Sequence, residues 1–165
     1  MKENIDSIYN MYFQNIYRFL LSLCHDHYTA EDLVQETFFR AHLTLEVYEG
    51  KSIKTWLFTV AYRAYIDHYR KQKRIVIKDD KFFTGIFDKK KYILDDLVAN
   101  EEIEEIVRLL DDIPEKHKYA VLLHDFHGLT QQEAAEVMSV KPSHYKVLLF
   151  RGRQAIRRRK AGENE

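Results

Sequence analysis

Cysteine, proline and glycine are all scarce in this sequence, and each scarcity excludes a class of protein. Cys24 is the single cysteine among 165 residues, which excludes a disulfide framework and a thiolate metal cluster and fits a reducing compartment. Two prolines and five glycines are few for a chain built of strands and tight turns. The composition therefore predicts an all-α protein.

Long apolar runs are also missing. The longest run is a few residues, as in "VLLF", far below the roughly 20 residues that a membrane-spanning helix needs. The N-terminus carries no basic, then apolar, then small-residue leader. We therefore expect a cytoplasmic protein without direct membrane insertion.

Net charge is zero, with 26 basic and 26 acidic residues, but the charge is strongly segregated along the chain. Residues 1–50 and 100–136 carry net charges of −5 and −7, residues 51–74 and 137–165 carry +6 each, and residues 75–99 are neutral. An acidic stretch is thus twice followed by a basic one. This pattern favours two modules, each with one face for a polyanion, over solvated helix faces in random order.

Apolar residues recur at helical spacing in two blocks of the chain. The first block contains three expected helices, beginning at Ile5, near Thr29 and after an N-cap at Ser52, with the third running to about Lys73. The expected buried faces of the second and third are Ala30, Leu33, Val34, Thr37, Phe38 and Ala41, and Ile53, Trp56, Leu57, Val60 and Ala64. Residues 75–99 lack a sustained period, so we expect a flexible linker, with a strand at 75–77 as the weaker alternative. The prediction is two small helical domains, 1–74 and 100–165.

The segment "LTQQEAAEVMSVKPSHYKVLLFRGRQAI" has the pattern of a helix-turn-helix. Thr130 and Glu133 form a capping box before a short helix, Ser139 and Val140 form a turn, and a second helix opens near Pro142. A major groove accepts one helix, and the residues near its start face the base edges. These would be Ser143, His144, Lys146 and Val147, while Arg151, Arg153 and Arg157 to Arg159 would neutralise phosphates. The alternative is an ordinary helical hairpin with a basic tail.

Two further patterns lie in the first block. One face of the second helix carries Asp32, Gln35, Glu36 and Phe39. This face suits a protein partner that buries the ring of Phe39 and contacts the carboxylates. The alternative is a solvated face with one exposed aromatic side chain. The third helix aligns aromatic rings in one narrow sector, flanked by basic residues. The rings are Phe58, Tyr62, Tyr65 and Tyr69, and the flanking cations are Lys54, Arg63 and Arg70. Rings beside cations suit single-stranded nucleic acid, although some of these rings are expected to be core.

Three segments together resemble a known family: "AEDLVQETFFRA", "IKTWLFTVAYRAYIDHYRKQKR" and the helix-turn-helix segment, in this order. The family is the extracytoplasmic-function (ECF) group of bacterial RNA polymerase sigma factors, within the sigma-70 family. The resemblance covers residues 5–74, region two of the family, and about 100–160, region four. It implies a non-enzymatic sigma factor that binds core RNA polymerase and directs promoter-specific transcription initiation, with no catalytic residue, cofactor or metal.

The resemblance also implies roles for individual residues. Asp32, Gln35, Glu36 and Phe39 would dock on the coiled coil of the largest core subunit. A flipped-out base of the melted non-template strand at the minus-ten element would be captured by Tyr48, Lys51, Ser52, Trp56, Tyr62, Arg63 and Arg70. The minus-thirty-five duplex would be read by Ser143, His144, Lys146, Val147, Arg151 and Arg153. A cognate anti-sigma factor is implied as a further partner, and the linker would thread through the polymerase.

Three positions depart from the family pattern. Arg63 stands where the family often has Asn, Ser139 stands where it usually has a turn glycine, and Leu148 replaces a common basic residue. We expect contacts with the minus-thirty-five element to be fewer, or shifted toward Lys146 and Arg151.

Two other functions are compatible with parts of the sequence. A free-standing helix-turn-helix regulator explains residues 129–160 but leaves "DLVQETF" and "TWLFTVAYRAYID" without a role. A metal-dependent enzyme would use His25, Asp26 and His27, or His124, Asp125 and His127, because His and Asp suit several metals. Neither cluster comes with a nucleotide-binding, nucleophile or zincin motif, so we expect no metal site.

Overall fold

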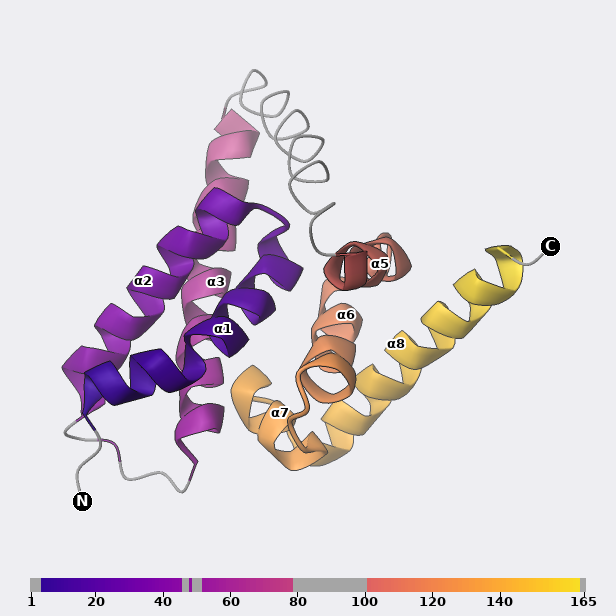
Figure 1. Cartoon of the computed structure of the whole chain (residues 1–165). Helices are drawn as coiled ribbons and strands as arrows, with labels where there is room; N and C mark the ends of the chain where they lie inside the picture. Colours follow the sequence, from indigo (N-terminus) through magenta and orange to yellow (C-terminus); the bar gives the residue numbers. More distant parts are fainter. Residues whose placement is uncertain (1–3, 46–47, 49–51, 79–100, 164–165) are drawn as a thin grey trace.

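The computed structural model describes residues 4–45, 48, 52–78 and 101–163, and every regular element among them is helical (Figure 1). The N-terminal module comprises α1 (Ile5–Cys24), α2 (His27–Thr44) and α3 (Ile53–Lys78). The C-terminal module comprises α5 (Glu101–Leu110), α6 (Glu115–Val121), the π-helical turn η3 (Leu122–Phe126), α7 (Gln131–Met138) and α8 (Pro142–Glu163). The predicted all-α fold with two helical domains is confirmed.

Polar side chains fix where the first two helices begin. Asn4 accepts a hydrogen bond from the Asp6 amide at 2.7 Å and caps α1. Asp26 caps α2 by accepting from the Tyr28 amide at 3.2 Å and from Thr29 Oγ1 at 2.6 Å. α2 therefore begins at His27, two residues before the predicted start, because Asp26 satisfies the exposed amides of its first turn.

The buried face of α2 is the one that its periodicity predicts. Ala30, Leu33, Val34, Thr37, Phe38 and Ala41 are all buried. They pack on α1, whose Ile16, Phe19 and Leu20 are at most 1% exposed. The sequence pattern succeeds here because α2 is covered from one side only, and its opposite face is left to solvent.

α3 differs from its prediction in length and in its buried face. It continues to Lys78, past the expected end near Lys73, so the weaker strand alternative at 75–77 is wrong. The rest of the predicted linker, 79–99, lies outside the described residues. Of its predicted buried residues, Leu57 and Ala64 are buried, whereas Ile53, Trp56 and Val60 are half-buried and Phe58, Ala61 and Tyr65 take their place in the core. The cause is that α3 is covered from two sides, by α1 and α2 and by the C-terminal module.

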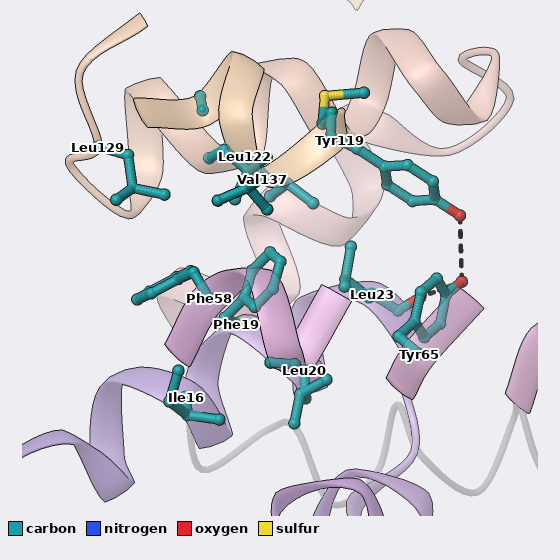
Figure 2. Packing of buried hydrophobic residues seen from close by; sticks show 14 of the residues in the cluster. Ile16, Phe19, Leu20, Leu23, Phe58, Tyr65, Tyr119, Leu122, Leu129 and Val137 are labelled. Atoms are coloured by element: carbon teal, nitrogen blue, oxygen red, sulfur yellow. Dashed lines mark hydrogen bonds between the residues drawn. The ribbon is translucent and has the colours of Figure 1, made fainter. Parts of the chain in front are cut away.

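The two modules share one continuous hydrophobic core (Figure 2). Phe19 and Phe58 rise from the N-terminal module toward Leu122, Leu129 and Val137 of the C-terminal module, as Figure 2 shows. At the other end of the contact, Tyr119 donates a hydrogen bond to the Tyr65 hydroxyl at 3.3 Å, and Tyr65 donates to the Leu23 carbonyl at 3.4 Å. The chain therefore folds with its two modules closed on each other.

The helix formed by α6 and η3 packs on α8 with one side. Its other side faces the N-terminal module, where Tyr119 meets Tyr65 and Leu122 lies toward Phe19 and Phe58 (Figure 2). Five consecutive residues, 119–123, are buried, which a helix covered from one side cannot achieve. In η3 the His127 amide reaches back five residues to the Leu122 carbonyl, at 2.9 Å. This wide turn ends the helix and leads into the helix-turn-helix.

Candidate functional site

The helix-turn-helix is held by the capping box that the sequence predicts. Thr130 Oγ1 accepts from the Glu133 amide at 3.1 Å, and Glu133 Oε1 accepts from the Thr130 amide at 2.9 Å. At the other end of α7, Ser139 adopts a left-handed conformation with φ 56°, and the Val140 amide donates to the Ala135 carbonyl at 3.0 Å. Ser139 thus occupies the backbone conformation that glycine usually takes at such a turn, and the turn forms without the glycine.

The orientation of α8 is set by the residues on its buried side. Tyr145 is fully buried and donates to the Ala120 carbonyl at 2.5 Å, and Leu148 and Leu149 are also buried. Leu148 therefore faces the core, and the expectation that contacts with the minus-thirty-five element are fewer or shifted toward Lys146 and Arg151 stays a prediction. The opposite side of α8 is left open to solvent.

We call the exposed side of α8 the reading face. It consists of Ser143, His144, Lys146, Val147 and Arg151, all exposed. Arg153 is different, because its guanidinium donates twice to the Asp125 carboxylate, at 2.9 and 2.6 Å. That hydrogen-bonded pair raises the pKa of Arg153 and holds its side chain against the end of η3. Five of the six predicted minus-thirty-five residues thus share one open face, and Arg153 is engaged within the protein.

Phe150 is a member of this face that the sequence reasoning missed. Its ring is 61% exposed and follows Val147 by one helical turn. An exposed ring at this position suits contact with thymine methyl groups in a major groove. The signal was present in the sequence, because Leu148 and Leu149 assign the core side of the helix and leave 147 and 150 on the other side.

The second surface is the docking stripe on α2, formed by Asp32, Gln35, Glu36 and Phe39. All four are exposed, with Phe39 at 60%, and Leu43 continues the stripe one turn further at 65%. Glu36 is held in place, since Arg40 Nε donates to Glu36 Oε1 at 2.8 Å while Arg40 Nη1 donates to Asp67 of α3 at 3.1 Å. The hydrogen bond to Glu36 is the main cause that raises the pKa of Arg40. The stripe thus has acidic and polar side chains toward the start of α2 and exposed apolar side chains toward its end, and Arg40 links it to α3.

The third surface lies at the start of α3. Ser52 Oγ accepts from the Thr55 amide at 3.2 Å, which confirms Ser52 as the N-cap. Tyr48 stacks on Trp56 with ring centroids 4.6 Å apart and planes inclined by 22°. Both rings are half-buried, and Lys51 lies outside the described residues. The structure therefore brings together an aromatic pair where the resemblance implies base capture.

The remaining predicted minus-ten residues lie further along α3 and on different sides of it. Arg63 and Arg70 are exposed. Tyr62 is half-buried, with its ring edge-on to that of Tyr119 at 5.7 Å, and burial raises the pKa of its hydroxyl. Tyr62 therefore faces the C-terminal module and does not join the Tyr48–Trp56 pair on an open surface.

The histidines of the two clusters contact neighbouring groups of the protein. His25 Nε2 lies 3.1 Å from the Ser22 carbonyl, and His27 contacts the Tyr17 hydroxyl and lies 3.0 Å from Glu31. His124 Nδ1 lies 2.7 Å from the Leu129 carbonyl, and His127 Nε2 lies 3.3 Å from Ser22 Oγ. Within the described part of the chain, no three metal-ligating side chains gather at one point. None of its helices is long and apolar enough to cross a membrane.

A helix-turn-helix with an exposed basic reading face, closed on a second helical module, defines a two-module DNA-binding protein. Comparison with known proteins narrows this class. The family model for Sigma-70 region 2 matches residues 8–75, and that for Sigma-70, region 4 matches residues 103–156. The chain belongs to the sigma-70 family of RNA polymerase sigma factors, in its ECF group. It is a non-catalytic initiation factor that directs promoter-specific transcription, which is the function that the sequence predicts.

Individual relatives agree with this assignment. The ECF RNA polymerase sigma factor SigM of Bacillus subtilis (strain 168) is 36% identical over 154 residues, which cover 93% of each chain. The ECF RNA polymerase sigma factor SigX of the same strain is 30% identical, covering 96% of this chain and 84% of its own length. Among solved structures, the fold resembles that of the sigma factor RpoE in complex with the anti-sigma factor NepR from Bartonella quintana. That match has a TM-score of 0.77 and 22% identity, and covers 93% of this chain and 94% of that one.

Proposed function

We propose that the chain carries out initiation through three separate surfaces. The docking stripe binds core RNA polymerase, with Phe39 as the apolar anchor and Asp32, Gln35 and Glu36 as the polar surround. The observation that supports this division is that the docking stripe and the reading face are both exposed on the same chain. A free-standing regulator would use the reading face and leave the docking stripe without a partner.

The reading face binds the minus-thirty-five element as a duplex. Ser143, His144, Lys146 and Val147 stand near the start of α8, where a helix placed in a major groove meets the base edges. Arg151 and the exposed cations toward the C-terminus of α8 neutralise phosphates, which gives affinity but little sequence choice. Arg153 acts through its ion pair with Asp125, which holds α8 against η3.

The minus-ten element is captured as a melted strand at the start of α3. Tyr48, Trp56 and Tyr62 supply stacking surfaces, and Lys51 and Ser52 help to capture the flipped-out base. Arg63 and Arg70 supply positive charge for the backbone. The continuation of α3 moves the proposed end of the first domain from residue 74 to Lys78, and the second domain is 100–165. A cytoplasmic location and a cognate anti-sigma factor complete the proposal, the latter supported by the likeness to RpoE in complex with the anti-sigma factor NepR.

Run-off transcription tests this function directly. Bacterial core polymerase is mixed with the protein and a pool of genomic promoter fragments, beside a reaction without the protein. We expect new, discrete transcripts that weaken when Lys146→Ala removes a cation from the reading face. The absence of transcripts, combined with tight and salt-sensitive binding of duplex DNA by the protein alone, would favour the free-standing regulator.

A further inference from the structure

The C-terminal module covers one face of α3, which we call the aromatic face. This face consists of Phe58, Tyr62, Tyr65 and Tyr69. Phe58 and Tyr65 are buried, and Tyr62 and Tyr69 are half-buried. From Thr55 to Tyr69 the contact follows four turns of the helix, or about 21 Å. The C-terminal module therefore occupies the side of α3 that displays its row of rings.

Each part of this contact pairs a residue of α3 or α1 with one from the C-terminal module. At the start of α3, Thr55 Oγ1 donates to Glu133 Oε2 at 2.6 Å. In the middle, the ring of His127 lies edge-on to Phe19 at 5.3 Å and near Phe58 at 6.0 Å. At the far end, the Tyr69 hydroxyl donates to Glu115. The contact is thus apolar in its middle and hydrogen-bonded at both ends.

Covering this face has a direct consequence for Tyr62. A base can stack on an aromatic ring only where the ring is open to solvent, and Tyr62 faces Tyr119 with their planes at 80°. The docking stripe and the reading face, by contrast, are exposed while the modules are closed. The closed form leaves two of the three proposed surfaces available and covers part of the third.

Glu133 connects this contact to the helix-turn-helix. One of its carboxylate oxygens completes the capping box at the start of α7, and the other accepts from Thr55 at the start of α3. Among the causes that lower the pKa of Glu133, the hydrogen bond from Thr55 is the largest. A single side chain thus ties the first turns of two helices in different modules.

We propose that the closed form is self-masked: the C-terminal module and single-stranded promoter DNA compete for the aromatic face of α3, and the Thr55–Glu133 hydrogen bond is the latch that favours the closed form. This inference rests on the proposed role of Tyr62 in minus-ten binding. It adds that the protein alone binds single strands weakly, and that separation of the modules uncovers the site. The apparent affinity of a masked site falls in proportion to the open fraction.

Thr55 is 4% exposed in the closed form, so a larger side chain at this position opens the latch by its bulk as well as by its charge. Thr55→Glu places a second carboxylate against Glu133, yet glutamate is favourable three residues after an N-cap such as Ser52. Adding Glu133→Gln removes the repulsion, and glutamine still completes a capping box with Thr130. Thr55→Ser keeps the hydroxyl and serves as the matched control. The added negative charge disfavours DNA, so a gain in binding cannot come from charge.

The experiment measures the radius of gyration by small-angle X-ray scattering and the affinity for a fluorescein-labelled single strand of mixed sequence. We expect Thr55→Glu to increase both the radius of gyration and the affinity. The affinity should rise about tenfold, which is the order of the contribution that one stacked base makes to binding. Thr55→Ser should behave as wild type, the Thr55→Glu, Glu133→Gln pair should gain less than Thr55→Glu alone, and adding Tyr62→Ala to Thr55→Glu should remove the gain. Binding of a duplex probe should not rise in any variant.

Two results would overturn the inference. One is an unchanged radius of gyration in Thr55→Glu, which would mean that the hydrogen bond is not the latch. The other is a Thr55→Glu protein that is expanded but binds the single strand no more tightly than wild type does. This includes the case in which neither protein binds the single strand. Run-off transcription by the wild-type protein is independent of either result, so failure of the self-masking leaves the sigma-factor function testable on its own.

Discussion

Phe39 projects a large apolar ring into solvent from the C-terminal end of the docking stripe, one turn after the carboxylates and the amide. A ring of this kind, once buried at an interface, contributes much of the binding energy, whereas its removal from an exposed site costs the free protein little stability. We predict that Phe39→Ala weakens binding to core polymerase by about 10- to 100-fold and leaves the free energy of unfolding unchanged. Fluorescence anisotropy of the labelled protein measures the first quantity, and urea unfolding the second.

Met11 provides a matched control for this prediction. It is 66% exposed, comparable to Phe39, but it lies on α1, outside the docking stripe. Met11→Ala should bind polymerase as wild type does. Equal losses for both variants would indicate a general effect of removing exposed apolar surface and would contradict the role of the stripe.

At the scale of residues, the sequence predicted side chains well where one neighbour decides their placement. The capping box of Thr130 and Glu133 was foreseen because both partners lie within one turn of chain. Phe150 was missed although the adjacent Leu148 and Leu149 indicate the core side of α8; the sequence does not show the contact that holds this side in place, the burial of Tyr145 against α6. That contact joins residues 25 positions apart, which local spacing cannot show.

α8 contains two glycines in opposite situations, and they make a prediction at the scale of the element. A Cβ atom on Gly152 would meet Val121 Cγ2 at 2.5 Å and the His117 carbonyl oxygen at 2.7 Å, whereas one on Gly162 would meet nothing within 4 Å. Gly152→Ala should therefore push α8 away from α6 and destabilise the protein by about 1–3 kcal/mol. Gly162→Ala should be neutral or stabilising by up to about 1 kcal/mol, because alanine is the better helix former.

Urea unfolding of the two variants tests this comparison, with duplex DNA binding as a second measurement. Gly152→Ala should also weaken duplex binding, since the reading face moves with α8. If Gly152→Ala were as stable as Gly162→Ala, α6 and α8 would separate without a cost in free energy. That result would contradict the close contact of Gly152 with Val121 and His117.

Helices covered from one side were predicted more accurately than helices covered from two. The buried face of α2 agrees residue for residue with its apolar period. α3 packs on elements of both modules, and α6 packs on α8 while its Tyr119 meets Tyr62 and Tyr65 of α3. Their buried residues therefore exceed what a single stripe contains. The wide turn η3 had no signal in the sequence.

The whole molecule should respond to pH through His127, which is half-buried between α1 and α3. Burial, together with the smaller effect of the charges of Arg18 and Lys54, lowers the pKa of His127 to about 4. The unfolded chain, with the ordinary pKa near 6.5, therefore takes up a proton first as the pH falls. The free energy of unfolding should decrease as the pH falls from about 6.5 toward 4, by about 2 kcal/mol between pH 7 and pH 5.

Urea unfolding at these two pH values measures the effect in wild type and in His127→Gln. The variant should lose much less stability over the same interval, because glutamine does not titrate. His42→Gln, at an exposed position, should keep the wild-type dependence. The pKa of Glu133 is lowered, so its own contribution is lost only at more acidic pH. An identical loss in His127→Gln would contradict the assignment.

At the scale of the whole molecule, the sequence predicted the two modules and their order. It did not predict that the two modules pack against each other. The charge pattern and the motifs each belong to one module, whereas the contacts that close them join distant residues, such as Thr55 with Glu133 and Ser22 with His127. The aromatic row on α3 was visible in the sequence, and its spacing is the same whether the rings meet bases or protein. Only the three-dimensional arrangement distinguishes the two.

The wide turn η3 has a consequence for comparing this chain with its relatives. A π-helical turn contains one residue more than an α-helical turn, and each residue of an α-helix advances the chain by about 100° around the axis. Deleting one residue within Leu122–Phe126 would rotate everything that follows by about that angle and carry Glu133 away from α3. An insertion or deletion of one residue between related chains is therefore best placed within this turn, where it changes the pitch of the helix rather than the residues that flank it.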